Sequence, residues 1–300
     1  MGIVSKILTS IIKRPYGRHT YKAAKLMREG ILLGTMLTNA ESWINMTQKD
    51  IEALEKPDTF LQRSILTQSG NPCKVFMNLE LGILPIKYVI IEKRLKFLRY
   101  ILNENKSSMI RKVFDELKKD SRRGDFIDLV VKDMEDVGID LSEDEIGCAS
   151  KLEWKKYVKE KVNSAALECL TNSNSTKTKT KHIQFHELKL SDYLSQNKNT
   201  SLSKTIFEAR SGILDIKTWN SWKYSDLLCV MCEKYEEIIE HFVTCRAYGK
   251  EPLETNWTEV FGNIVVNQNI VAKEIKRRQF MRKRKLDEVG LPPPLAPLLQ

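Results

Sequence analysis

The segment "CVMCEKYEEIIEHFVTC", residues 229–245, holds three of the chain's six cysteines and one of its four histidines. Cys229 and Cys232 are separated by two residues, so both thiolates can reach one ion from a tight turn. His241 and Cys245 stand four residues apart, which places both side chains on one face of a helix. The spacing C-x2-C-x8-H-x3-C therefore predicts a structural zinc ion with four protein ligands. A helix that carries these groups by chance is the alternative.

Catalytic chemistry is not predicted anywhere in the sequence. Four protein ligands leave no open position on the expected zinc for a reactive water. The chain has no Gly-rich phosphate loop, no GxSxG or GxGxxG motif, and no two adjacent aspartates, whereas two-metal polymerases and nucleases need clustered carboxylates. His182 and His186 lie four apart without an HExxH pattern, so we expect a surface segment there and no zinc hydrolase. The chain by itself is not expected to be an enzyme.

Charge and cysteine content narrow the class of protein. The net charge of +10 favours an anionic partner, of which nucleic acid is the most common, although solvated lysines are the alternative explanation. Six cysteines in 300 residues do not form a disulfide scaffold. Lysines interrupt the apolar run at residues 2–13, so it does not predict a signal peptide, and no uncharged run reaches the ~18 residues of a membrane span. We expect an intracellular protein of the nucleus or cytoplasm with no membrane partner.

Apolar periodicity predicts a mainly α fold, and the scarcity of Gly and Pro disfavours a turn-rich β protein. The clearest helix is expected to open at Pro85. Pro57 is expected to kink or break an earlier helix. The apolar stripe of the clearest helix, which we expect in the core, consists of Tyr88, Ile91, Leu95, Leu98 and Leu102.

Helix caps and a polar segment predict where the chain divides. Ser142 with Glu145, and Ser150 with Glu153, match capping boxes at two helix starts. The segment "TNSNSTKTKTK", residues 171–181, contains no apolar residue and predicts a flexible linker. We therefore expect a boundary between a helical region and a later module that carries the cysteines.

A series of phrases resembles the C-terminal part of a non-LTR (LINE-type) retrotransposon reverse transcriptase. In order they are "GIVSKILTSI", "ILLGTMLTNAESWINMTQKDIEALEK", "FMNLELGILPIKYVIIEKRLKFLRYILN", "GDFIDLVVKDMEDVGIDLSEDEI", "WKKYVKEKV" and, before the cysteines, "FEARSGILDIKTW". The resemblance runs from about residue 2 to about residue 285. It implies a thumb region followed by a CCHC zinc knuckle, in a family that copies RNA into DNA by target-primed synthesis. The palm motif (Y/F)-x-D-D, the fingers and an endonuclease are not recognisable, so the chain is expected to bind a template–primer without extending it.

With the resemblance, the expected fold is a helical thumb-like bundle, a flexible linker, a small zinc knuckle and a basic C-terminal helix. The expected regions are 1–170 for the thumb-like bundle, 171–200 for the polar linker, 201–262 for the knuckle module, and 263–300 for the basic helix and Pro-rich tail.

The expected partner is RNA or DNA, as template–primer or target site, with the remainder of the polyprotein as a further partner. Phosphate contacts should come from lysine and arginine and make affinity depend on salt. Trp219, Trp222 or Tyr224 are expected to stack on unpaired bases, and the alternative is that they fill a small core around the metal. The basic run at 282–285 also matches a nuclear-import signal. The candidate phosphate-binding residues are Lys93, Lys96, Arg277, Arg278, Arg282, Lys283, Arg284 and Lys285.

Two other classes of function stay open at this point. The chain can be a retained, transposon-derived interaction module whose helices bind another protein, with no nucleic-acid role. An intact enzyme is the third class, and the missing carboxylates disfavour it.

Overall fold

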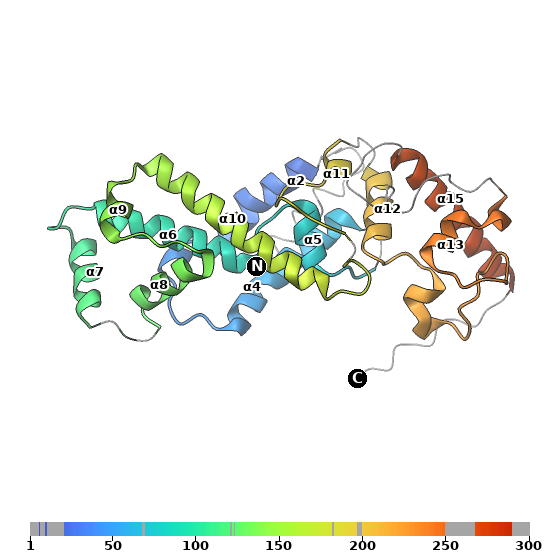
Figure 1. Cartoon of the computed structure of the whole chain (residues 1–300), viewed down its shortest axis with the longest axis horizontal. Coiled ribbons are helices and arrows are strands. Elements are labelled where there is room, and N and C mark those ends of the chain that lie inside the picture. Colours follow the sequence, from blue (N-terminus) through green and yellow to red (C-terminus); the bar gives the residue numbers. More distant parts are fainter. Residues whose placement is uncertain are drawn as a thin grey trace. The chain divides into compact units, whose positions relative to one another are not determined.

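The computed structural model of the chain is mainly helical, which confirms the predicted fold class (Figure 1). In the part of the chain that the structure describes there is no β-strand, and one isolated antiparallel bridge joins Leu228 and Glu236. None of the helices in that part is long and apolar enough to cross a membrane. The expected Pro-rich tail and most of the segment 2–13 lie outside the described residues. The structure describes residues 6, 10, 21–67, 70–120, 122, 124–181, 183–196, 200–249 and 268–289.

The chain forms two compact units, and each is built from three separate stretches of sequence. The first unit comprises Met1–Ile65, Lys74–Thr176 and Phe185–Leu190, and the second comprises Leu66–Cys73, Lys177–Gln184 and Ser191–Gln300. The helical elements of the first unit are α2 (Tyr21–Met27), η1 (Arg28–Leu33), α3 (Gly34–Met36), η2 (Ala40–Ser42), α4 (Gln48–Leu66), α5 (Lys74–Leu81), α6 (Ile86–Asn103), α7 (Met109–Lys119), α8 (Phe126–Val137), α9 (Glu143–Cys148) and α10 (Lys151–Ser175).

The core of the first unit lies between α6 and the long helix α10, which run side by side (Figure 1). The predicted stripe of α6 is confirmed, because its first four members are buried and Leu102 packs at the edge of the same cluster. From α10, Trp154 enters this core and donates its indole N–H to the backbone oxygen of Leu95 at 2.9 Å. The buried indole N–H is therefore hydrogen-bonded.

The predicted helix starts are also present. Pro85 stands at the N-cap of α6. In both predicted capping boxes, at the starts of α9 and α10, the serine hydroxyl accepts an amide N–H and the glutamate carboxylate accepts the serine N–H. These hydrogen bonds lower the pKa of Glu145 and of Glu153. The acidic residues here serve as caps, as expected.

Two sequence predictions need correction in this unit. Helix α4 does not break at Pro57 but continues through it, and the next residue, Asp58, forms a buried pair with Arg28 at 2.6 and 2.8 Å that ties this half of the helix to η1. The linker predicted from residue 171 does not begin there, because α10 continues through Ser175. Its buried positions recur every four residues up to Asn174, so packing against the unit outweighs the polar composition.

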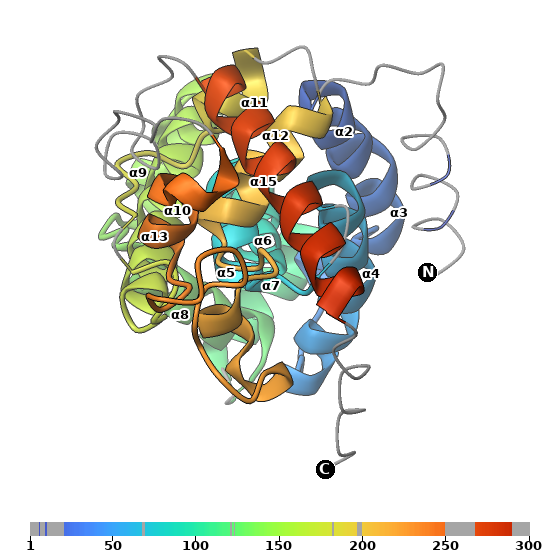
Figure 2. The same cartoon turned by 90° about the vertical axis from the view of Figure 1, so that its right-hand side faces the viewer.

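The second unit places the basic helix against the cysteine-rich segment. Residues of the expected linker also fold here, since Tyr193 and Leu194 are buried in the short helix α11. Helix α15 is the predicted basic helix, and it packs on α12 and α13 (Figure 2). The helical elements are α11 (Asp192–Gln196), α12 (Thr200–Arg210), η3 (Lys217–Lys223), α13 (Ile239–Thr244), η4 (Arg246–Tyr248) and α15 (Gln268–Val289).

Gly82 allows the segment Phe185–Leu190 to pack closely in the first unit. Its φ is +58°, and a Cβ built on it would lie 2.0 Å from the backbone carbon of Lys189. A left-handed conformation costs an L-residue about 1–2 kcal/mol, and overpacking costs about 1–3 kcal/mol more. We therefore expect Gly82→Ala to lower the free energy of unfolding by about 2–4 kcal/mol, measured by urea denaturation.

Gly147 provides the matched control for this substitution. It lies within α9, and a Cβ there has nothing within 4 Å. Gly147→Ala should leave stability unchanged or raise it by up to about 1 kcal/mol, because alanine is the better helix former. Equal effects of the two substitutions would contradict the close approach at Gly82.

Candidate metal centre

A short turn carries the first two cysteines. The amide of Cys229 donates to the oxygen of Tyr235 at 2.7 Å, and the amide of Glu233 donates back to the oxygen of Cys229 at 2.8 Å. Glu233 has φ +58°, the left-handed conformation that lets the chain reverse within so few residues. The isolated bridge described above closes the turn. Cys232 therefore lies in the same loop as Cys229, and both thiols can bind one metal ion.

The other two ligands come from α13 and its C-terminal end. His241 lies within this helix, and Cys245 follows at its C-cap with its amide donating to the oxygen of His241 at 2.8 Å. Phe242 and Val243 face the core of the second unit and fix the rotation of the helix. The spacing of four residues thus delivers both donors to the side of α13 that faces the turn, as predicted.

The structure brings the four predicted ligands together. Their donor atoms all lie within 4.8 Å of one another. Cys229 Sγ is 3.9 Å from Cys245 Sγ, and Cys232 Sγ is 3.2 Å from Nε2 of His241. A tetrahedral ion with metal–sulfur bonds of about 2.3 Å has ligand–ligand edges of about 3.8 Å. The cluster therefore fits one tetrahedral metal ion, and two separate elements supply the donors.

Burial and hydrogen bonds shift the pKa values of the four predicted ligands. Burial raises the pKa of the Cys229 thiol to about 12, and burial also raises the pKa of Cys245. Burial acts in the same direction on Cys232, but hydrogen bonds from the amides of Lys234 and Tyr235 outweigh it, so the pKa of Cys232 is lowered. Burial lowers the pKa of His241, which favours the neutral imidazole that ligates metals. A metal that binds here must displace thiol protons.

Glu237 anchors the elements that surround the cluster. Its side chain has no exposed surface, and the amides of Lys217 and Val230 donate to it at 2.8 and 3.4 Å. The guanidinium of Arg282, from α15, donates to both carboxylate oxygens at 3.0 Å. This one carboxylate thereby joins η3, the cysteine turn and α15. A buried charge with a full set of donors is stable, and removal of one partner is costly.

Arg278 joins the same helix to the end of α13. Its side chain is fully buried and donates to the backbone oxygens of Phe242 and Cys245 at 2.9 and 3.0 Å. Glu274 accepts from it at 2.7 Å. Arg278 therefore satisfies carbonyls at the C-terminal end of α13, beside a metal ligand.

These contacts correct part of the predicted phosphate-binding set. Arg278 and Arg282 lie in the interior, so their prediction as phosphate-binding residues is wrong. Both are on the face of α15 that packs against the unit, at the same helical spacing as Val271 and Ile275. Arg277 is half-buried and is held by Glu274 and by the oxygen of Tyr248.

The remaining candidates are distributed over both units. On α15, Lys283 and Arg284 are exposed, Arg284 with Glu288 at 3.1 Å, whereas Lys285 is half-buried. In the first unit, Lys93 Nζ donates to the oxygen of Leu37 at 2.8 Å, and Lys96 pairs with Glu92. The predicted stretch 282–285 therefore does not present one uniform basic surface.

The predicted stacking residues behave differently from one another. Trp219 packs against the core of the second unit, and Tyr224 is half-buried beneath the guanidinium of Arg282. Trp222 is 58% exposed, with the ammonium of Lys223 5.1 Å from its ring. Trp219 fits the core-filling alternative, whereas Tyr224 contacts Arg282 and Asp215, and Trp222 is exposed enough to contact a partner.

The sequence pattern did not single out three residues that matter here. Glu237 is one of several glutamates between the cysteines, and only its burial distinguishes it. Glu274 pairs with two arginines, and hydrogen bonding to Arg277 and Arg278 lowers its pKa to about 2. Tyr235 is 65% exposed, and its ring centroid lies 5.4 Å from that of His241. In the sequence, Tyr235 could have been noticed because it lies between the second cysteine and the histidine of the C-x2-C-x8-H spacing.

We expect Cys232→Ser to abolish stoichiometric metal binding and to unfold residues from about 215 to 249, because a site of this size folds with its metal. The first unit should keep its helices. Metal content after desalting and far-ultraviolet circular dichroism measure the two effects. Cys148→Ser, an exposed cysteine in α9, is the control. Loss of helicity throughout the chain would contradict independent folding of the units.

Metal affinity should fall as the pH is lowered. The raised pKa of Cys229 and of Cys245 means that binding releases their protons, so each displaced proton costs about tenfold in affinity per pH unit. Competition with a chelator at about pH 8 and about pH 6 measures this dependence. Affinity that is independent of pH would exclude the thiols as ligands.

Arg282→Met should lower the free energy of unfolding of the second unit by about 3–5 kcal/mol, because it leaves the buried carboxylate of Glu237 without its cation. Arg284→Met in the same helix removes the same charge from an exposed pair and should cost no more than about 1 kcal/mol. Urea denaturation compares the two variants, and similar losses would show that Glu237 does not need Arg282.

Comparisons of the chain with protein-family models, curated proteins and solved structures found no match. The arrangement of the cysteines, the histidine and their buried supports is therefore the basis for assigning a function.

Proposed function

We propose that this chain is a nucleic-acid-binding C-terminal part of a LINE-type reverse transcriptase, in which the Cys/His cluster holds a structural zinc ion. The observation that carries the proposal is the convergence of Cys229, Cys232, His241 and Cys245 on one point of tetrahedral size. The ordered resemblance of the preceding sequence to that family supports the same assignment.

Zinc is the metal that the donor set favours. Three thiolates and one imidazole are soft and borderline ligands, and tetrahedral sets of this kind are typical of structural zinc. The four side chains complete the coordination of such an ion, so we assign it a folding role. Thiolates of this kind persist in a reducing environment, which supports a location in the nucleus or cytoplasm.

The surface of the second unit offers a place for a single strand. Trp222 and Tyr235 are exposed aromatic rings, and Tyr235 lies in the cysteine turn. Lys234 is exposed next to Tyr235, Arg246 is exposed next to Cys245, and Lys223 lies over the Trp222 ring. Aromatic rings that stack on bases, combined with cations that attract phosphates, characterise proteins that bind single strands.

We assign this chain a binding role within a longer RNA-directed DNA polymerase. The metal cluster is complete with four protein donors, and the sequence has no paired aspartates that could hold catalytic metals. Primer-extension activity of this chain with a homopolymer template would contradict the assignment.

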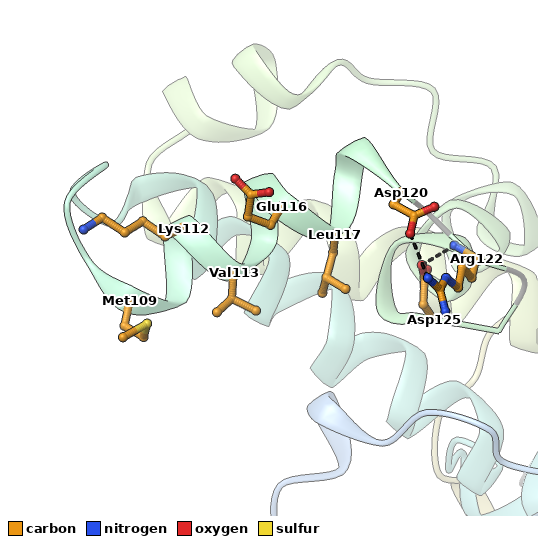
Figure 3. Close-up of a pocket in the computed structure, with 8 residues that line it drawn as sticks. All are labelled: Met109, Lys112, Val113, Glu116, Leu117, Asp120, Arg122 and Asp125. Atoms are coloured by element: carbon orange, nitrogen blue, oxygen red, sulfur yellow. Dashed lines mark hydrogen bonds and ion pairs between the residues drawn. The ribbon is translucent and has the colours of Figure 1, made fainter.

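A protein-interaction module is the second candidate, and one feature of α7 favours it. Met109, Val113 and Leu117 project from the same side of this helix (Figure 3). Met109 is 77% exposed, and the three residues line a groove of about 580 Å³. Exposed apolar surfaces often mark contacts with another protein.

Fluorescence anisotropy with labelled single-stranded RNA and DNA, at two salt concentrations, tests the nucleic-acid proposal. The metal-loaded chain should bind, and more weakly at the higher salt. Negligible binding at low salt would overturn the proposal and favour the interaction module. Elemental analysis of the purified chain should find one zinc, and any other dominant metal would overturn the zinc assignment.

Tyr235→Ala should weaken strand binding about 5- to 150-fold, because loss of one stacked base costs about 1–3 kcal/mol. Tyr100→Ala is the matched control, since Tyr100 is a similarly exposed tyrosine in the first unit. Metal content should be unchanged in both variants. Equal affinity of the Tyr235 and Tyr100 variants would exclude stacking on Tyr235.

A further inference from the structure

A pocket in the first unit gathers lysines from three separate helices. It has a volume of about 580 Å³ and lies between α2 with η1, α6, α10 and the loop after α5. Lys25 reaches it from α2, Lys93 from α6, and Lys155 and Lys159 from successive turns of α10. Four lysines from distant parts of the sequence thus line one hollow.

The cations of this pocket are only partly compensated. Arg28 also lines it, but Asp58 neutralises Arg28 through two hydrogen bonds. Of the two carboxylates in the lining, Glu92 is paired with Lys96, which offsets its charge. Glu29 forms no ion pair with any residue that the structure describes, and this one carboxylate does not match the charge of four lysines.

The individual lysines are anchored to different degrees. Lys25 donates to the oxygen of Gly82 at 2.5 Å, and Lys93 donates to the oxygen of Leu37 with Glu41 at 4.0 Å. The carbonyl oxygens carry no full negative charge, and Glu41 offsets part of the charge of Lys93. Lys155 and Lys159 are exposed, and neither forms an ion pair with any residue that the structure describes.

The pKa of Lys25 reflects its burial and the charges around it. Burial lowers the pKa of Lys25, and the neighbouring charges of Arg28 and Lys159 lower it further, against the opposing effect of Glu29. Like charges held together in a concave, partly desolvated place cost free energy. A bound anion would remove that cost, and the field of such a pocket attracts anions.

We propose that this pocket is a binding site for a phosphate group, held by Lys25, Lys93, Lys155 and Lys159. Phosphate oxygens accept several N–H donors at once, and Asn163 adds an amide in the same lining. The phosphate can belong to a nucleic-acid strand or to a small phosphate compound. In the first case the inference rests on the proposed function, and in the second it is independent of it.

The test compares two double variants of the full-length, metal-loaded chain. Lys155→Gln with Lys159→Gln removes two charges from the pocket, at exposed positions of α10 where the fold should persist. Lys151→Gln with Lys156→Gln removes the same charge from exposed positions of the same helix outside the pocket. Circular dichroism verifies that both variants keep their helices.

Two probes distinguish the sources of the phosphate. Calorimetric titration with pyrophosphate reports a small compound, and anisotropy of a labelled single-stranded oligonucleotide over a range of salt reports a strand. The pocket variant should bind at least one probe about tenfold more weakly. For the oligonucleotide, the slope of log affinity against log salt concentration should become shallower by about 1.4, which is about 0.7 for each lost phosphate contact. The control variant should bind both probes nearly as the unmodified chain does.

Each outcome decides between the two proposals. Pyrophosphate binding that needs the pocket, in a chain that binds no oligonucleotide, supports the pocket and overturns the proposed function. Oligonucleotide binding that is the same in both variants, without pyrophosphate binding, overturns the pocket and leaves the proposed function standing. If the unmodified chain binds neither probe, both proposals fall.

Discussion

A carboxylate without access to water must be met by a full set of donors, and Glu237 places this requirement on the second unit. It draws amides from Lys217 and Val230 and the guanidinium of Arg282 to one point. The amide of Glu237 itself donates to the oxygen of Leu227, across the base of the cysteine turn. Because these groups come from η3, the turn and α15, satisfying one buried charge fixes the elements that carry the metal ligands.

The basic residues of the chain serve two different physical purposes. Arg278 and Arg282, on the inner face of α15, donate to carbonyl and carboxylate groups and so link this helix to its neighbours. In the pocket beside α10, Lys25 and Lys93 donate to backbone oxygens, whereas Lys155 and Lys159 form no ion pair with a described residue, so the charge of these two is available to an external anion. The net charge counts both kinds of basic residue equally, whereas their burial distinguishes them. The electrostatic potential of this protein is therefore set by a subset of its lysines and arginines.

Local chemistry explains how much of this structure could be predicted. The metal ligands, the capping boxes and the stripe of α6 depend on spacing within one turn or helix, and the structure places all of them as expected. The end of α10, the continuity of α4 at Pro57 and the burial of Arg278 depend on what each element packs against. Those tertiary contacts are not encoded in any short window of sequence. For the same reason the lysine pocket could not be found from the sequence, since its members come from residues 25, 93, 155 and 159.

The discontinuity of the two units has a consequence for how the chain can be divided. The polypeptide passes from one unit to the other several times, and the first unit is complete only when Phe185–Leu190 has joined it. Leu188 of that stretch packs against the α6–α10 cluster, and Lys189 covers Gly82. A fragment truncated at Thr176 would lack these contacts, so the shortest self-sufficient piece must extend to Leu190. During synthesis, the ribosome must therefore release residues of the second unit before the first has finished folding.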